Sequence, residues 1–216
     1  MKLLIADDHA LFRDGLKKII FEKIPDVEIG EASSYGELIE KLNKFDWDII
    51  ILDLNMPGRS GFEALIELKT KKPDAKILVL SMYPESQFAT RSIKAGAKGY
   101  LTKGASVEEL IEAINSILRG DVYFTKEVAK VIAEDLRTNI DSKINSLSDR
   151  EFQIFMLLAE GNSVSSIAKK LSLSIKTIST FKKRILDKLG LESSVDLVKF
   201  AIENKLITIS SKNDKS

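Results

Sequence analysis

Hydrophobic positions in the first 120 residues alternate between short continuous runs and longer stretches in which every third or fourth residue is apolar. The short runs are typical of strands and comprise Leu3–Ala6, Val27–Glu31, Ile49–Leu52, Ile77–Ser81 and Gly99–Thr102. The longer stretches have the spacing of one-sided helices and comprise Leu11–Lys23, Tyr35–Lys44, Phe62–Lys71, Gln87–Ala95 and Val107–Arg119. Five alternations of strand and helix predict an α/β fold, a five-stranded parallel sheet that is doubly wound by helices.

The pattern changes after Gly120, where the clusters of β-branched residues stop. A connecting helix is predicted over Val122–Leu136, followed by a polar joint, Arg137–Asn145. Four further helices predict an all-α domain, with segments at Phe152–Leu158, Val164–Leu171, Ile175–Leu189 and Ser194–Asn204. We therefore expect a first domain over residues 1–120, a linker over 121–145 and a second domain over 146–216.

Start and stop signals support several of these helices. Serine and glutamate three residues apart have the spacing of a capping box, and this pair occurs at Ser34–Glu37, Ser106–Glu109 and Ser148–Glu151. Gly161 is expected to end the helix that the last of these pairs begins.

The amino-acid composition excludes several kinds of functional site. The chain has no cysteine, which excludes disulfides, thiolate zinc sites and cysteine nucleophiles. It has one histidine, His9, which we interpret as a residue that begins a helix. No apolar run approaches the roughly 18 residues of a membrane span. The apolar stretch at the start of the sequence is too short to be the apolar region of a signal peptide. We therefore expect a cytoplasmic protein that does not contact a membrane.

Acidic residues follow the predicted strands at the edge of the sheet where ligands bind in open α/β folds. Asp7 and Asp8 follow the first strand, Asp53 follows the third, Ser81 ends the fourth, and Lys103 lies just after the fifth. Three adjacent carboxylates repel one another, and Mg²⁺, which prefers oxygen ligands, would offset that repulsion. A carboxylate can also accept a phosphoryl group, so these residues fit a magnesium-dependent aspartyl phosphate. Each residue taken alone also fits helix capping or turn chemistry.

Positive charge collects in the second domain. The first 120 residues carry 17 basic and 19 acidic side chains, whereas the rest of the chain carries 16 and 13. We define the basic cluster as the seven cationic residues between Ser163 and Gly190, which are Lys169, Lys170, Lys176, Lys182, Lys183, Arg184 and Lys188. A solvated helix face is the simpler interpretation of such a cluster, and nucleic-acid binding is the functional one.

Two helices separated by a short turn lie within this basic region. The second of them, Ile175–Leu189, has the dimensions of a helix that enters a DNA major groove. Lys176, Ser179, Thr180 and Lys183 recur at spacings of three or four and so share one face. We expect bases to be contacted by Ser179, Thr180 and Lys183, and phosphates by Lys176 and Lys182.

The first half of the chain resembles the receiver domain of bacterial two-component response regulators. The matching residues are Asp7-Asp8, Asp53 to Gly58, Gly61, Ser81, Tyr100 and Lys103. The resemblance implies that Asp53 accepts a phosphoryl group from a sensor histidine kinase. It also implies magnesium ligands (Asp7, Asp8, Asp53 and the backbone carbonyl of Asn55), phosphoryl contacts (Ser81 and Lys103) and an aromatic switch residue (Tyr100). Gly104 stands where many receivers have proline, which leaves the isomer of the Lys103–Gly104 bond open.

The second half resembles the LuxR-type helix-turn-helix of the NarL/FixJ response regulators. The matching segments are Leu147 to Glu151, Leu158 to Gly161, Ile167-Ala168, Ser174 with Lys176 to Ile178, and Lys188 to Gly190. The resemblance implies that Ile175–Leu189 is the recognition helix and that Ser194–Asn204 mediates pairing on DNA. Ser166 and Phe181 depart from the family, which usually has an acidic residue and a histidine at these positions.

These observations predict a transcription factor that is switched by phosphorylation of Asp53. Phosphorylation is expected to favour a homodimer that binds double-stranded promoter DNA, and the chain is expected to act as a phosphoacceptor rather than an enzyme. Two alternatives are a magnesium-dependent phosphohydrolase that forms an aspartyl phosphate, and a constitutive DNA-binding protein with a degenerate receiver.

Overall fold

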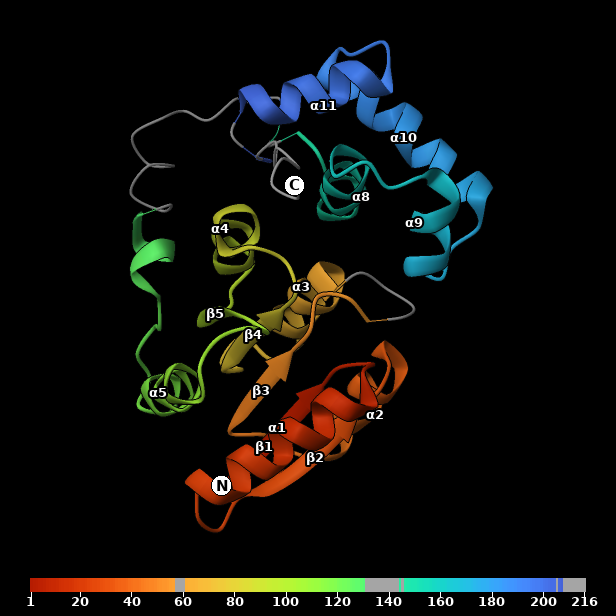
Figure 1. The fold of residues 1–216 in the computed structure, drawn as a ribbon. Coiled ribbons are helices and arrows are strands. Elements are labelled where there is room, and N and C mark those ends of the chain that lie inside the picture. Colours follow the sequence, from red (N-terminus) through yellow and green to blue (C-terminus); the bar gives the residue numbers. More distant parts are fainter. Residues whose placement is uncertain (57–60, 131–143, 145, 205, 208–216) are drawn as a thin grey trace, which may run out of the picture. The chain divides into compact units, whose positions relative to one another are not determined.

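The computed structural model describes residues 1–56, 61–130, 144, 146–204 and 206–207 (Figure 1). The chain divides into two compact units, Met1–Thr138 and Asn139–Ser216. Within the described residues, the first unit is an α/β unit and the second contains helices without strands. This arrangement confirms the predicted fold class.

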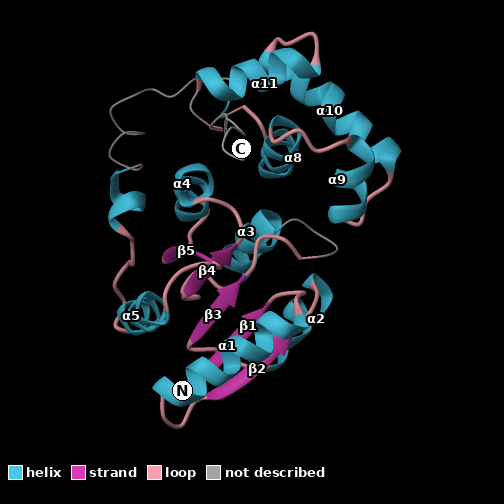
Figure 2. Ribbon diagram, viewed as in Figure 1, coloured by secondary structure: helices cyan, strands magenta, loops and turns pink. Residues whose placement is uncertain are grey.

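The first unit contains five parallel strands in the order β2-β1-β3-β4-β5 (Figure 2). The strands are β1 (Lys2–Ala6), β2 (Glu28–Ala32), β3 (Ile49–Leu52), β4 (Ile77–Ser81) and β5 (Gly99–Thr102). The helices are α1 (Ala10–Lys23), α2 (Tyr35–Lys44), α3 (Gly61–Lys71), α4 (Glu85–Lys94) and α5 (Val107–Leu118). The order reverses between β1 and β3, so the carboxyl ends of these strands flank the crevice where open α/β sheets bind ligands.

The sheet is covered on both faces, and strand alternation decides which side chains face which helices. Leu3 and Ile5 of β1 pack in one core with Leu16 and Ile20 of α1 and with Ile114 of α5. Intervening strand residues such as Leu4 are equally buried but lie outside this core. They face the opposite layer, to which α2, α3 and α4 belong (Figure 1). β3 is a continuous apolar run and is buried along its whole length, as expected of a central parallel strand.

The segment after Gly120 corrects one prediction. The connecting helix was expected to begin at Val122, but helical structure begins at Lys126 and is described only as far as Lys130. Tyr123 instead continues the sheet, since it forms an isolated bridge to Gly99 and its N–H donates to the Lys98 carbonyl at 2.9 Å. The rest of the predicted helix and most of the polar joint lie outside the described residues.

The second unit contains α8 (Asp149–Ala159), α9 (Val164–Lys170), α10 (Ile175–Leu189) and α11 (Ser194–Glu203). α8 contacts each of the other three. Phe155 of α8 meets Phe200 of α11 edge to face, with ring centroids 6.2 Å apart, and Ile178 and Ile185 of α10 are fully buried. Each buried side chain of this size contributes about 2 kcal/mol, so packing rather than helix propensity holds this unit together.

The helix signals are largely confirmed. Ser106–Glu109 and Ser148–Glu151 form complete capping boxes. Ser34 caps α2, but the Glu37 carboxylate accepts from the N–H of Ser33 rather than from that of Ser34, so this box is incomplete. α8 ends at Ala159, and Gly161 then adopts a φ of 85°, which a residue with a side chain rarely does.

Candidate functional site

The predicted acidic residues meet at the carboxyl ends of β1 and β3, where Lys103 lies between two of them. The Lys103 Nζ is 2.5 Å from Asp7 Oδ2 and 2.7 Å from Asp53 Oδ2. Both carboxylates are almost completely buried, at 4% and 1% exposure of their side chains. Strand pairing explains the approach, because Ala6 and Leu52 are neighbours in register and the next residues leave the sheet side by side.

Burial dominates the electrostatics of Asp53. Loss of solvent raises the pKa of the Asp53 carboxyl above its usual value, and the Lys103 ammonium opposes this without cancelling it. The N–H of Asn55 donates to Asp53 Oδ1 at 3.0 Å, which fixes the orientation of the carboxyl group. The expected contribution of Asn55 was its carbonyl oxygen, and its N–H is an additional contact to the same aspartate.

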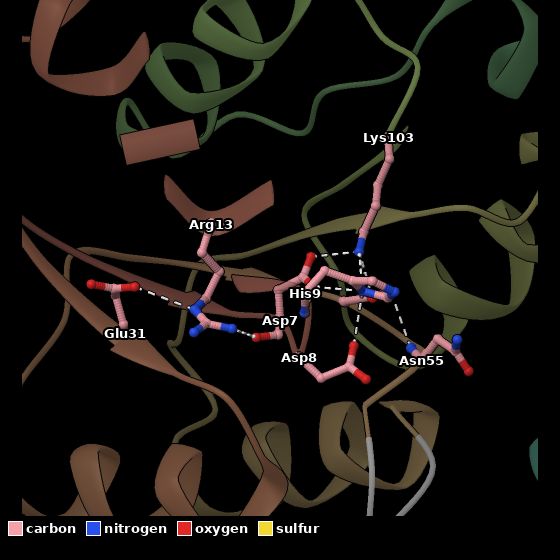
Figure 3. A network of polar contacts seen from close by, with 8 residues as sticks. Asp7, Asp8, His9, Arg13, Glu31, Asn55 and Lys103 are labelled. Carbon is pink, nitrogen blue, oxygen red and sulfur yellow. Dashed lines mark hydrogen bonds and ion pairs between the residues drawn. The ribbon is translucent and has the colours of Figure 1, made fainter. Parts of the chain in front are cut away.

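Asp8 joins the group through His9. The His9 Nδ1 lies 2.9 Å from Asp8 Oδ1 and 3.0 Å from Asp7 Oδ1 (Figure 3). Ligand atoms of Asp7, Asp8, His9 and Asp53 all lie within 4.8 Å of one another. The prediction that His9 only begins a helix was therefore incomplete. His9 does occupy the N-cap of α1, but its side chain makes no capping bond and contacts the aspartates instead.

Arg13 holds the loop that carries Asp7, and sequence reasoning missed it. Its Nη1 donates to the Asp7 carbonyl at 2.6 Å and its Nε to Glu31 Oε2 at 3.2 Å (Figure 3). Lys17 also donates to Glu31, at 2.6 Å, and this bond, with a further contribution from Arg13, holds the pKa of Glu31 below its usual value. Arg13 lies one helical turn after His9, and that spacing was the available signal for its position beside the loop.

The predicted switch residues are buried in the first unit. Ser81 and Tyr100 are both fully buried, at the end of β4 and in β5. The Tyr100 hydroxyl donates to the Tyr83 carbonyl at 2.8 Å, and burial raises its pKa well above the usual value. The N–H of Lys103 donates to the Ser81 carbonyl, which joins the two loops. The described residues contain no cis peptide bond, so the Lys103–Gly104 bond is trans.

The donor set suits a hard divalent cation. Asp7, Asp8 and Asp53 supply carboxylate oxygens on neighbouring loops, which are the ligands that Mg²⁺ takes in proteins. The buried ammonium of Lys103 adds a fixed positive charge beside the same oxygens. An anion with several oxygens, such as a phosphoryl group, would therefore meet the Lys103 ammonium at Asp53, beside carboxylates that could hold a divalent cation.

The second candidate site is the exposed side of α10. Lys176, Ser179, Thr180 and Lys183 are exposed, as their shared face predicted, and Lys182 is partly exposed. The Thr180 hydroxyl donates to the Lys176 carbonyl at 3.0 Å, which leaves its oxygen able to accept. Ser174 caps the helix through its contact with the Thr177 N–H. The amino end of α10 and its lysines thus offer several donors to phosphates.

One member of the basic cluster serves the fold of the second unit. Lys188 Nζ contacts Glu151 Oε2 at 2.6 Å and the Ser146 carbonyl at 3.2 Å, which joins α10 to the start of α8. Although burial alone would raise the pKa of Glu151, the bonds from Lys188 and Ser148 hold it below its usual value. This ion pair could not be predicted from local sequence patterns, because 37 residues separate its members.

A parallel sheet with buried aspartates at its carboxyl edge, followed by a helical unit with a basic helix, defines a response regulator with a DNA-binding domain. Comparison with known families agrees. The family described as "Response regulator receiver domain" matches residues 3–115, and the family described as "Bacterial regulatory proteins, luxR family" matches residues 145–201. The chain belongs to the NarL/FixJ family of response regulators.

Curated relatives match along nearly their whole length. The "Response regulator GacA" of Pseudomonas aeruginosa is 34% identical over 98% of this chain and 100% of its own. The "Oxygen regulatory protein NreC" of Staphylococcus carnosus is 36% identical over 96% of this chain and 99% of its own. RcsB from Salmonella enterica serovar Typhimurium, solved bound to promoter rprA with phosphomimetic BeF3⁻, shares 31% identity and a TM-score of 0.62. That alignment covers 93% of this chain and 98% of RcsB.

The helices of the described residues are short or polar compared with a membrane span. None of them is long and apolar enough to cross a bilayer.

Proposed function

We propose that this chain is a transcriptional regulator switched by phosphorylation of Asp53. The observation that carries the proposal is the position of the Asp53 carboxylate. It is buried at the end of β3, 2.7 Å from the Lys103 ammonium and in one cluster with Asp7 and Asp8. In this proposal residues 1–120 form the receiver domain, 121–145 the linker and 146–216 the DNA-binding domain.

The proposed reaction transfers a phosphoryl group from a phosphohistidine of a sensor histidine kinase. An Asp53 oxygen forms the new P–O bond as the P–N bond to the donor histidine breaks, and the imidazole leaves with its electron pair. Lys103 and Ser81 would contact the phosphoryl oxygens, which carry the developing charge. Mg²⁺ held by Asp7, Asp8, Asp53 and the Asn55 carbonyl would supply further charge neutralisation when bound.

The proposed switch passes from Asp53 to Ser81 and Tyr100. A phosphoryl group adds about two negative charges at neutral pH. Ser81 would turn toward its oxygens, and this shift would stabilise the buried position in which Tyr100 already lies. The Tyr100 hydroxyl bond to the Tyr83 carbonyl supports this coupling, because it ties the aromatic ring to the β4–α4 loop.

The proposed output is binding of a homodimer to promoter DNA through α10. Lys176, Ser179, Thr180, Lys182 and Lys183 would form the contact surface, with α11 as the pairing helix. The RcsB structures support this, since they include promoter complexes and dimers bound to DNA. Two recognition helices would meet half-sites about one helical turn apart. The chain would take part in its own phosphotransfer and dephosphorylation without turning over an external substrate.

Intact-protein mass after incubation with acetyl phosphate tests the proposal. One added phosphoryl group is expected for the wild type in the presence of Mg²⁺ and is expected to disappear without Mg²⁺ or in Asp53→Asn. The matched control is Asp46→Asn, since that aspartate is fully exposed and should leave the adduct intact. An adduct that survives Asp53→Asn would overturn the assignment, and continuing release of phosphate from a phosphomonoester would indicate a phosphohydrolase.

A further inference from the structure

His9 reaches the acidic cluster with a side-chain nitrogen as well as with its backbone. Its N–H donates to Asp7 Oδ1 at 2.8 Å, while Nδ1 lies 3.0 Å from that oxygen, 2.9 Å from Asp8 Oδ1 and 3.4 Å from Lys103 Nζ. The dashed contacts in Figure 3 converge on this ring nitrogen from several sides. The imidazole remains about half exposed, at 54%, so the cluster is open to solvent and solutes at His9.

A single ring nitrogen cannot serve both carboxylates equally by hydrogen bonding. Nδ1 carries at most one hydrogen, whereas it lies within hydrogen-bonding distance of one oxygen of each carboxylate. A cation bound by His9 Nδ1, Asp7 Oδ1 and Asp8 Oδ1 would contact all three atoms at once. Adjacent ligands of an octahedral ion with bonds of about 2.1 Å lie about 3 Å apart. The two distances from Nδ1 to Asp7 Oδ1 and Asp8 Oδ1 have this value.

We propose that His9 is a nitrogen ligand of the cation site and that it shifts the preference of this site toward Mn²⁺ and Co²⁺ relative to Mg²⁺. The inference rests on the proposed function, which assigns the carboxylates of the same cluster to a divalent cation. Its chemical basis is ligand type. Mg²⁺ favours carboxylate, carbonyl and water oxygens, whereas imidazole suits first-row transition metals, whose affinities rise from Mn²⁺ through Co²⁺.

Pulsed electron paramagnetic resonance of the Mn²⁺-loaded full chain tests the ligand directly. A ¹⁴N coupling of a directly bound imidazole is expected, and it should be lost in His9→Gln. The assignment is unambiguous in protein without an affinity tag, because the sequence contains one histidine. Absence of this coupling in the wild type would overturn the inference.

Calorimetric titration with Co²⁺ and with Mg²⁺ tests the preference. His9→Gln should weaken Co²⁺ binding by about tenfold or more and Mg²⁺ binding by clearly less. An increase in both affinities would instead mean that His9 competes with the cation as a positive charge, which would overturn the proposal. Asp8→Asn is the comparison variant, and it should weaken the binding of both cations because it replaces a charged carboxylate ligand with a neutral amide.

The inference and the proposed function can fail separately. A wild-type protein that forms the Mg²⁺-dependent Asp53 adduct, but shows no nitrogen coupling with Mn²⁺, would contradict the role of His9 alone. A wild-type protein that binds none of the three cations and forms no adduct would contradict both.

Discussion

The Lys103 ammonium contributes to stability as well as to the proposed chemistry, because it neutralises two buried carboxylates at once. Lys103→Met would leave both charges without this partner, and removal of one member of a buried ion pair costs about 3 kcal/mol. We expect urea unfolding of the first unit, followed by fluorescence of Trp47, to show this loss in magnesium-free buffer.

Lys44→Met is the control for this measurement. Its ammonium also contacts a carboxylate, that of Glu40, at 2.6 Å, but both side chains are more than half exposed. Exposed pairs of this kind contribute less than about 0.5 kcal/mol. Equal losses in Lys103→Met and Lys44→Met would contradict the role of burial.

The positions of some side chains in the site could be predicted from the sequence, and those of others could not. The convergence of Asp7, Asp53 and Lys103 was predictable, because the carboxyl ends of parallel strands meet at one edge. The contacts of His9 were not, because the loop conformation before α1 decides where its ring points. Its helix-start position was correctly inferred, yet helix position says nothing about a side chain that makes no capping bond.

Gly61 of α3 and Gly36 of α2 differ in how closely other atoms approach them. A Cβ on Gly61, at the start of α3, would lie 2.2 Å from the Leu54 Cα, which is backbone and cannot move aside. Gly61→Ala should therefore push α3 away from the loop after β3 and cost about 2 kcal/mol. A Cβ on Gly36, in α2, would have its nearest neighbour at 4.0 Å, and Gly36→Ala should stabilise the first unit by about 0.5 kcal/mol.

Urea unfolding followed by Trp47 fluorescence measures both glycine variants in one experiment. Gly61→Ala is expected to lower the free energy of unfolding, and Gly36→Ala is expected to raise it. A Gly61→Ala variant as stable as the wild type would contradict the close packing of α3 on Leu54.

Some elements were predicted to the residue and others were not, and α8 begins at Asp149, three residues before its predicted start, although it has a complete capping box. β3 is continuously apolar and α10 has a serine cap and a glycine end, and both match their predicted bounds. The helix expected from Val122 was wrong at its start, because Tyr123 pairs with β5. That pairing is a tertiary contact, and the local helical spacing of Val122 and its neighbours gave no sign of it.

The Glu151–Lys188 pair predicts a pH-dependent link between α8 and α10. The pKa of Glu151 is lower in the folded state, so its contribution is complete above the unfolded pKa of about 4.3 and is lost as pH falls through the folded pKa. Glu151→Gln should cost about 1.5 kcal/mol at pH 7, typical of hydrogen bonds to a charged group. This cost should shrink below about pH 4 as the wild-type carboxylate is protonated.

Urea titration of the full chain at several pH values, read from the amide resonances of α10, measures this difference. Glu203→Gln, an exposed residue at the end of α11, should change little at any pH. A cost for Glu151→Gln that is the same at pH 7 and pH 3.5 would argue against the charged pair.

At the scale of the whole molecule, a nearly neutral sum conceals two units of opposite character. The formal net charge is +1, yet the basic cluster lies entirely in the second unit. Composition alone therefore gives no hint of an anionic partner, whereas the position of the charges along the chain does. The division into two units was predictable for the same reason that the fold class was, because the hydrophobic period changes after the sheet ends.

Salt dependence of DNA binding follows from this distribution. Each lysine–phosphate contact adds about 0.9 to the slope of log affinity against log salt, since binding releases condensed counterions. Lys182→Ala should reduce that slope by about 1, measured by fluorescence anisotropy with a labelled duplex. Lys188→Ala should leave the slope unchanged while it destabilises the second unit, because its ammonium contacts Glu151 and the Ser146 carbonyl. Lys44→Ala, in the first unit, should change neither slope nor affinity, and a reduced slope in that variant would mean that DNA contacts extend beyond the basic cluster.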